Sequence, residues 1–152
     1  MNDKVSKYNS LLSQINSLVD REVGLIANLA NISAAIKEEF DFLWIGFYLV
    51  SGNELQLGPF QGPVACTKIA YGKGVCGSSW KKEEILIVDD VQLYPGHISC
   101  NEAARSEIVL PVRDKAGKVL GVLDIDSKEV AGFDATDNQY LSQVVKAIES
   151  IL

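Results

Sequence analysis

The sequence predicts an α+β fold, in which helices at both ends of the chain flank a central, mostly antiparallel sheet of about six strands. Apolar residues recur at helical spacing in the first forty residues and again near the C-terminus. Short runs of aromatic and β-branched residues, separated by turns, fill the middle. The 152 residues correspond to one domain. We divide it into an N-terminal helical segment (1–40), a sheet with loops (41–130) and a C-terminal helix (134–151).

The N-terminal segment carries two apolar stripes with helical spacing. The first stripe either packs on the chain's own sheet or forms the surface of a homodimer, and the sequence leaves both readings open. The two stripes consist of Val5, Tyr8, Leu11, Leu12, Ile15, Leu18 and Val19, and of Leu25, Ile26, Leu29, Ile32 and Ile36.

The middle of the chain predicts strands joined by tight turns. FLWIGFYLV (42–50) and ELQLG (54–58) flank the turn SGN (51–53) and predict a hairpin. Further strands are expected at 64–70, at 85–88 and on both sides of a turn at 114–118. A glycine-rich turn (72–74) precedes a short helix near 76–80, and Asp134 is expected to cap the C-terminal helix.

Composition excludes several classes of partner. A net charge of −6 and a pI near 4.8 argue against nucleic acid and membranes, because phosphate-rich surfaces require a basic protein. No apolar run approaches the roughly 18 to 20 residues that span a bilayer. The polar N-terminus, MNDKVSKYNSLLSQ, lacks the apolar stretch of a signal peptide. We therefore expect a cytoplasmic protein.

The three cysteines, Cys66, Cys76 and Cys100, are too widely spaced for a CxxC redox pair. In a reducing compartment an odd number of cysteines indicates free thiols, metal ligands or redox catalysts rather than structural disulfides. Together with His97 they form a Cys₃His set, but structural zinc sites usually contain paired CxxC knuckles, and the chain has none. We predict no metal and no bound cofactor.

Cys100 has the strongest local signal for a reactive thiol. Ser99 and Glu102 match a capping box, which predicts a short helix beginning at Cys100. In the first turn of a helix, the macrodipole and free N–H groups would lower the pKa of the thiol. His97, the only histidine, lies three residues upstream and would help if it were close and protonated. The alternative is a partly buried, inert cysteine.

Three acidic residues are expected to converge on one face of the sheet. In VLGVLDIDS, Asp124 and Asp126 share a face with Leu120 and Val122, and Glu107 opens the preceding strand. Acids gathered on one face require a cation or a retained proton. The alternatives are a solvated sheet end, and a divalent metal, for which DxD on a strand is weak evidence.

The aromatic strand at 43–49 has two different faces. Trp44, Gly46 and Tyr48 share one face, which suits the floor of a small-ligand pocket, although such rings are more often the wetter side of a sheet. The other face is continuous core and consists of Leu43, Ile45, Phe47 and Leu49.

Five motifs follow one another in order between residues 58 and 127: GPFQGPVAC (58–66), GKGVCG (72–77), PGHISC (95–100), RSEIV (105–109) and GVLDIDS (121–127). WIGFY (44–48) extends the series upstream. With these motifs the chain resembles the free methionine-(R)-sulfoxide reductases, which are small proteins of the GAF fold. The resemblance implies a single GAF-like domain over residues 1–152 and an oxidoreductase that repairs free methionine-(R)-sulfoxide.

The resemblance also implies a role for each thiol. Cys100 would attack the sulfoxide sulfur and become a sulfenic acid, and Cys66 would condense with it to form a disulfide. Cys76 would be a second or alternative resolving thiol, and thioredoxin or another dithiol would reduce the disulfide. Asn101 stands where the family pattern has an aspartate, and we expect only a modest effect on the thiolate.

The resemblance assigns the substrate-binding residues as well. Glu107, Asp124 and Asp126 match the acids that hold the ammonium group of the ligand and assist the sulfoxide oxygen. Trp44 and Tyr48 match the aromatic wall around the methyl-sulfur end. Two other readings remain, a non-catalytic GAF module that binds a small ligand and a redox sensor that uses the same thiols.

Overall fold

The computed structural model describes residues 3–152, so residues 1 and 2 of the predicted N-terminal segment lie outside the described residues. Six strands form one antiparallel sheet in the order β3-β2-β1-β6-β5-β4. The predicted α+β fold with about six strands is confirmed. In chain order the elements are α1 (Asp3–Leu18), α2 (Leu25–Glu39), β1 (Trp44–Ser51), β2 (Glu54–Gln61), β3 (Lys68–Ala70), α3 (Gly74–Lys82), β4 (Leu86–Val88), the 3₁₀ helix η1 (Val91–Leu93), β5 (Ser106–Arg113), β6 (Val119–Ser127) and α4 (Ala135–Glu149).

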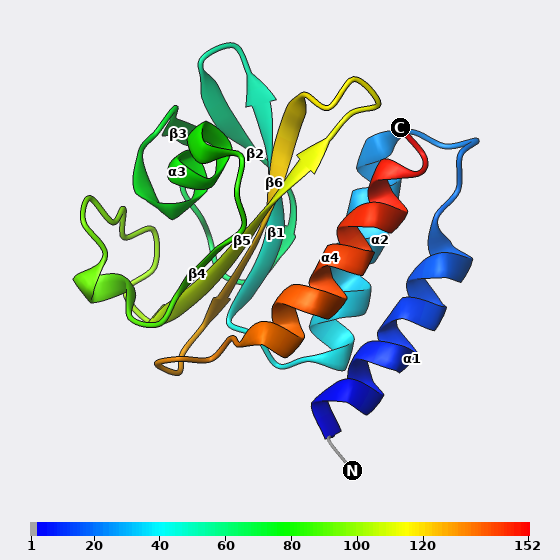
Figure 1. Cartoon of the computed structure of the whole chain (residues 1–152), viewed down its shortest axis with the longest axis horizontal. Helices are drawn as coiled ribbons and strands as arrows, with labels where there is room; N and C mark the ends of the chain where they lie inside the picture. Colours follow the sequence, from blue (N-terminus) through cyan, green and yellow to red (C-terminus); the bar gives the residue numbers. More distant parts are fainter. Residues whose placement is uncertain (1–2) are drawn as a thin grey trace.

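The helices divide unequally between the two faces of the sheet. α1, α2 and α4 lie on one face, and α3 lies on the other with the loops around it (Figure 1). Each face has its own hydrophobic cluster. One cluster joins the three long helices to residues such as Phe47 and Leu123, and the other joins α3 to residues such as Tyr48 and Val122.

The stripe on α1 packs inside the molecule. Its residues Tyr8, Leu11 and Ile15 are fully buried in the helical cluster. α1 contacts α2 and α4 and lies outside them, so the stripe contacts the other helices rather than the sheet (Figure 1). Tyr8, Leu11 and Ile15 have no exposed surface to offer a second copy of the chain. The remaining stripe residues are half-buried, so a homodimer stays a prediction: Val5, Leu12, Leu18 and Val19.

Strand β1 alternates as predicted, with one exception. Ile45 and Phe47 enter the helical cluster, while Trp44 and Tyr48 enter the cluster beside α3. Leu43 was expected with Ile45 but packs on the Trp44 side. It precedes the first residue of β1, so the pleat does not fix its direction. Gly46 leaves space for the indole, since a Cβ there would lie 2.6 Å from Trp44 Cη2.

Several element boundaries differ from the prediction. The strand predicted at 64–70 is confined to Lys68–Ala70, and residues 64–67 form a loop in which Ala65 and Cys66 are half-buried. The helix predicted near 76–80 extends over Gly74–Lys82, and the C-terminal helix ends at Glu149 rather than at residue 151. Asp134 caps that helix in a capping box with Asp137, as its sequence position predicted.

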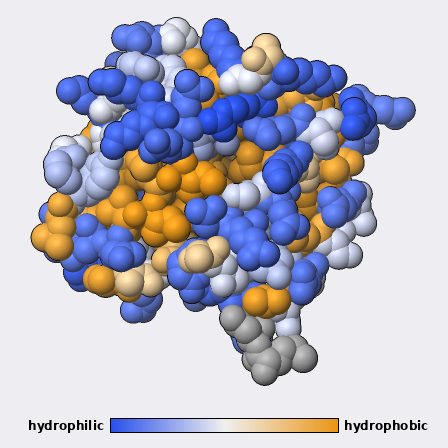
Figure 2. Space-filling model, viewed as in Figure 1, coloured by the Kyte–Doolittle hydropathy of each residue, from blue (hydrophilic) through white to orange (hydrophobic). Residues whose placement is uncertain are grey.

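The molecular surface in the view of Figure 2 is largely hydrophilic. Hydrophobic side chains gather on the side where β4 and η1 lie, and Ile87 and Leu93 are exposed hydrophobic residues of these elements (Figure 2). Within residues 3–152, no helix combines the length and the apolarity needed to cross a bilayer.

A buried polar contact fastens α1 to α4. Tyr8 donates a hydrogen bond to Asp137, whose other carboxylate oxygen accepts bonds from Lys4 and from the backbone N–H of Asp134. Asp137 is 1% exposed, so its charge depends on these donors.

We predict that Tyr8→Phe lowers the free energy of unfolding by about 1–2 kcal/mol, because a buried carboxylate loses one donor. Urea unfolding followed by circular dichroism measures the difference. Tyr140→Phe is the matched control, since its ring stacks on Tyr8 at 5.1 Å and no hydrogen bond of its hydroxyl is found among residues 3–152. Equal losses in both variants would contradict a specific role for the Tyr8 hydroxyl.

Candidate functional site

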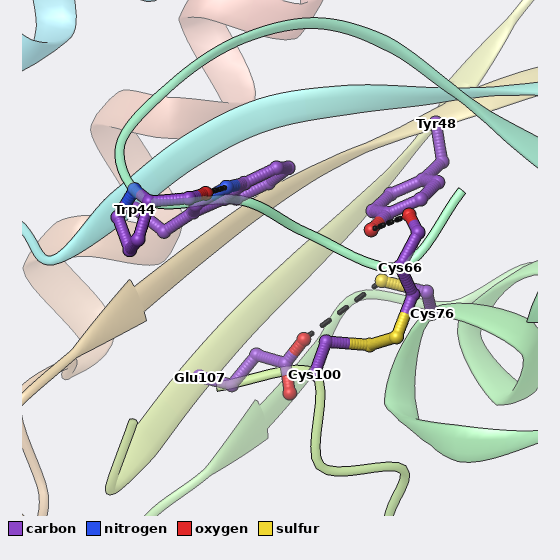
Figure 3. The surroundings of a disulfide bond; sticks show 7 residues. Trp44, Tyr48, Cys66, Cys76, Cys100 and Glu107 are labelled. Atoms are coloured by element: carbon purple, nitrogen blue, oxygen red, sulfur yellow. Dashed lines mark hydrogen bonds between the residues drawn. A yellow bond between two sulfur atoms is a disulfide. The ribbon is translucent and has the colours of Figure 1, made fainter. Parts of the chain in front are cut away.

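A cavity of about 60 Å³ lies on the face of the sheet that carries α3. All the predicted site residues except Cys66 line it, and Cys66 is covalently joined to one of them. They come from five separate parts of the chain, and Figure 3 shows several of them converging. The lining residues predicted from sequence are Trp44 and Tyr48 on β1, Cys76 on α3, Cys100 on the loop after η1, Glu107 on β5, and Asp124 and Asp126 on β6.

A disulfide joins Cys66 to Cys100 across 34 residues of sequence, with a Cα–Cα distance of 5.4 Å. Cys66 lies in the loop between β2 and β3, and Cys100 lies in the loop between η1 and β5. Cys76, in the first turn of α3, stays a free and buried thiol. The wide spacing of the cysteines thus reflects separate loops that meet over one cavity (Figure 3).

The short helix predicted at Cys100 is absent from the described structure, so that prediction is wrong. Cys100 lies at a bend, and the side chain of Asn101 accepts a hydrogen bond from the backbone N–H of Ala103 at 2.8 Å. The carbonyl of Asn101 also accepts from Ala104. This Asn turn competes with a helix for the same backbone groups. The helix dipole therefore cannot activate the Cys100 thiol.

His97 does not replace the missing helix as a source of positive charge. It lines the cavity and is half-buried, and loss of solvation lowers its pKa. A lowered pKa favours the neutral imidazole at pH 7, which stabilises a thiolate less well than imidazolium.

The register of the sheet brings the acids together. Glu107 on β5 is paired with Asp126 on β6, and Val109 is paired with Asp124, so all three carboxyl groups point to the same face. Glu107 is 6% exposed and Asp124 is 5% exposed. The solvated-end reading is therefore wrong for these two residues, whereas Asp126 is half-buried.

The acids have few partners. The Cys76 thiol donates to Glu107 Oε2 at 3.8 Å, but Asp124 Oδ1 has no hydrogen-bond partner within the described part of the chain. None of the described residues that line the cavity is lysine or arginine. The cavity thus combines several acidic groups with no fixed positive charge, which favours a cationic ligand.

Burial raises the pKa of every acid in the cluster. For Glu107 it acts together with the charges of Asp124 and Asp126, and holds the pKa well above its usual range. For Asp126 the charge of Asp124 adds to burial. Burial also raises the pKa of Asp124, although hydrogen bonds with Glu107 and Cys76 oppose the shift. These shifts favour the protonated, neutral form of the three acids compared with exposed carboxyl groups.

The two predicted aromatic residues have a second contact that sequence reasoning missed. Trp44 and Tyr48 are 4% and 2% exposed, so they are not the wetter side of the sheet. Trp44 Nε1 donates to the carbonyl of Pro63 at 3.1 Å, and the Tyr48 hydroxyl donates to the carbonyl of Cys66 at 2.9 Å. Both rings therefore hold the loop that carries Cys66 (Figure 3). Nothing in the residue pattern indicated these carbonyl partners.

The Cys₃His set considered from sequence does not assemble, because Cys66 and Cys100 are joined in the disulfide. A different group of possible metal ligands does come together in the cavity. The ligand atoms of Cys76, Glu107 and Asp124 lie within 4.8 Å of one another, and all three residues are buried. Strand register and the position of α3 create this group, so no local spacing in the sequence marks it.

Comparison with known proteins gives consistent matches over nearly the whole chain. The GAF domain family matches residues 26–152. GAF domain-containing protein A of Dictyostelium discoideum is 52% identical over 97% of this chain and 93% of its own length. The free methionine-R-sulfoxide reductase of Escherichia coli is 42% identical over 99% of this chain and 91% of its own length. A crystal structure of the Neisseria meningitidis free methionine-R-sulfoxide reductase with its substrate superposes with a TM-score of 0.94, at 45% identity over 99% of this chain and 91% of that one.

We predict that Cys76 in the disulfide form reacts slowly with iodoacetamide, because burial and the charges of Asp124 and Glu107 raise its pKa and the thiolate is the reactive form. Its alkylation rate should continue to rise with pH beyond the point at which an exposed cysteine is fully titrated. Mass spectrometry of the Cys76 peptide measures the rate, and the same protein in guanidinium is the control. Equal rates and equal pH profiles in the two samples would contradict the raised pKa.

Proposed function

The chain belongs to the free methionine-(R)-sulfoxide reductase family of GAF domains, and on this premise we propose that it reduces free methionine-(R)-sulfoxide to methionine. One observation carries the proposal for this chain's own residues. The Cys66–Cys100 disulfide stands at a cavity that contains buried acids, two aromatic rings and no lysine or arginine among its described lining residues. These features match a thiol reaction on a small molecule with an ammonium group.

In the first step, the Cys100 thiolate attacks the sulfoxide sulfur. The sulfoxide oxygen takes one proton and passes from the substrate sulfur to the Cys100 sulfur, so that methionine leaves and Cys100 becomes a sulfenic acid. Glu107 is the candidate proton donor, because burial and the charges of Asp124 and Asp126 raise its pKa and so favour the protonated carboxyl group.

In the second step, the Cys66 thiol attacks the Cys100 sulfenic acid, and water leaves as the disulfide forms. The hydrogen bond from Tyr48 to the Cys66 carbonyl supports this role, since it fixes the backbone of the resolving residue close to Cys100. Cys76 makes no disulfide in this structure and is assigned the second, alternative resolving role.

In the third step, an external dithiol such as thioredoxin reduces the disulfide by two exchange reactions and leaves as a disulfide itself. Val64 and Ile98 line the cavity and are 88% and 38% exposed, so apolar side chains are available beside the disulfide for a protein reductant. The need for a reductant is consistent with the cytoplasm.

Preference for the free amino acid would come from the acid cluster. Asp124, with its unpartnered oxygen, and Asp126 are assigned to the ammonium group, which a methionine inside a polypeptide lacks. Trp44 and Tyr48, whose rings lie 5.8 Å apart, are assigned to the methyl-sulfur end.

A redox sensor is the second candidate function, because the disulfide alone would serve it. A sensor has no use for buried acids at the same cavity. The deciding experiment measures methionine release from the free R and S epimers of the sulfoxide, with dithiothreitol and matched enzyme. Turnover of the R epimer alone supports the reductase, and no turnover by the folded, reduced protein would favour the sensor or a ligand-binding domain.

We predict that Cys100→Ser abolishes methionine release, whereas Cys66→Ser still releases about one methionine per chain and then stalls with thioredoxin as the reductant. Rapid-quench analysis of methionine separates the first turnover from recycling. Activity above a few per cent in Cys100→Ser would remove the nucleophile assignment. Normal recycling in Cys66→Ser would transfer the resolving role to Cys76.

We predict that Asp124→Asn and Glu107→Gln each lower kcat/KM by more than about fivefold, or about 1 kcal/mol of transition-state stabilisation, because each removes a charge or a proton donor. Steady-state kinetics with free methionine-(R)-sulfoxide measure the change. Glu84→Gln changes an exposed acid that does not line the cavity, and it is the control. Unchanged kcat/KM in both acid variants would contradict the roles assigned to Asp124 and Glu107 in substrate binding and proton donation.

A further inference from the structure

We infer that Cys76, Glu107 and Asp124 form a binding site for a thiophilic divalent cation such as Zn²⁺. No local motif marks this set of three, because the residues lie on α3, β5 and β6. The sequence offered only the DxD that contains Asp124, which is weak evidence for a divalent metal. Their ligand atoms lie within 4.8 Å of one another.

The spacing of the three groups fits tetrahedral coordination. Zinc–sulfur and zinc–oxygen bonds of about 2.3 and 2.1 Å at a tetrahedral angle separate the two ligand atoms by about 3.6 Å. Cys76 Sγ and Glu107 Oε2 are 3.8 Å apart. The three groups therefore need only small movements to close on one ion.

An independent observation points to a ligand at this position. Asp124 is 5% exposed and lines the cavity, and its Oδ1 has no hydrogen-bond partner within residues 3–152. A buried oxygen without a donor is costly unless a ligand satisfies it. The cavity of about 60 Å³ has room for roughly four to six water molecules, which is enough for an ion that keeps one water as its fourth ligand.

Ligand chemistry selects the kind of ion. A thiolate is a soft ligand that favours Zn²⁺ or Cd²⁺ over Mg²⁺ or Ca²⁺, which prefer oxygen. Two carboxylates and one thiolate carry three negative charges, and a divalent ion offsets two of them. Binding displaces the protons held by the thiol and by the acids.

The proposed ion would share Asp124 with the substrate ammonium group and would occupy Glu107, the proposed proton donor, so it should act as a reversible inhibitor. This regulatory consequence rests on the proposed function, whereas binding of the ion does not. The site exists in the disulfide form, where Cys76 is the one cysteine that remains a free thiol.

The disulfide form also provides a clean test, because any thiolate–metal band must come from Cys76. Titration of the oxidised protein with Cd²⁺ should give an ultraviolet sulfur-to-cadmium charge-transfer band that saturates at one ion per chain, and Zn²⁺ should displace it. Glu107→Gln and Asp124→Asn should each weaken Cd²⁺ binding by at least about tenfold, while Glu84→Gln leaves it unchanged. Circular dichroism checks that each variant is folded. If one of the two acid variants is unfolded, the other acid variant decides the test.

No band at millimolar Cd²⁺, or equal affinity in the wild type and both acid variants, would overturn the site. Free methionine should raise the half-saturating Cd²⁺ concentration. If Cd²⁺ binds but methionine does not compete, the shared use of Asp124 is wrong, and the assignment of Asp124 to the ammonium group fails with it. Inhibition of the reduced enzyme by Zn²⁺ and its reversal by EDTA then test the regulatory consequence separately.

Discussion

Glu107 and Asp124 lie on neighbouring strands, buried at a cavity that has no lysine or arginine among its described lining residues. Buried carboxyl groups are usually paired with a basic side chain. These two have no such partner among the described residues that line the cavity. The acids therefore retain protons or await a cationic ligand. The raised pKa of Glu107, the unpartnered oxygen of Asp124 and the placement of Cys76 beside both all express this single electrostatic constraint.

Strand register enforces that constraint, and the rest of the fold fixes the register. β5 and β6 pair along their length, and residues such as Ile108 and Ile125 point to the helical side of the same strands that carry the acids. A one-residue slip would place the acids against the long helices and the isoleucines in the cavity. The cluster on the helical side therefore fixes the strand register that keeps the three acids at the cavity.

The sequence predicted the sheet and the terminal helices because their residue patterns are local and periodic. It located the acids through strand alternation, and Asp134 through a capping pattern. The helix predicted at Cys100 from Ser99 and Glu102 does not form, because the side chain of Asn101 makes a turn with the same backbone. Sequence reasoning also missed the bonds from Trp44 and Tyr48 to the Cys66 loop, since backbone carbonyl positions depend on tertiary packing that residue types do not encode.

The two hydrophobic clusters lie on opposite faces of one sheet, so stability and chemistry are physically separable in this chain. The long helices pack on the face of the sheet opposite α3, and each of the cysteines lies on α3 or in a loop. A descendant that exchanged Cys100 for serine would retain a folded domain with an acidic, aromatic-walled cavity. Such a chain would be a starting point for a ligand receptor. Only a few loop substitutions would then separate a reductase from a domain that binds a ligand without turning it over.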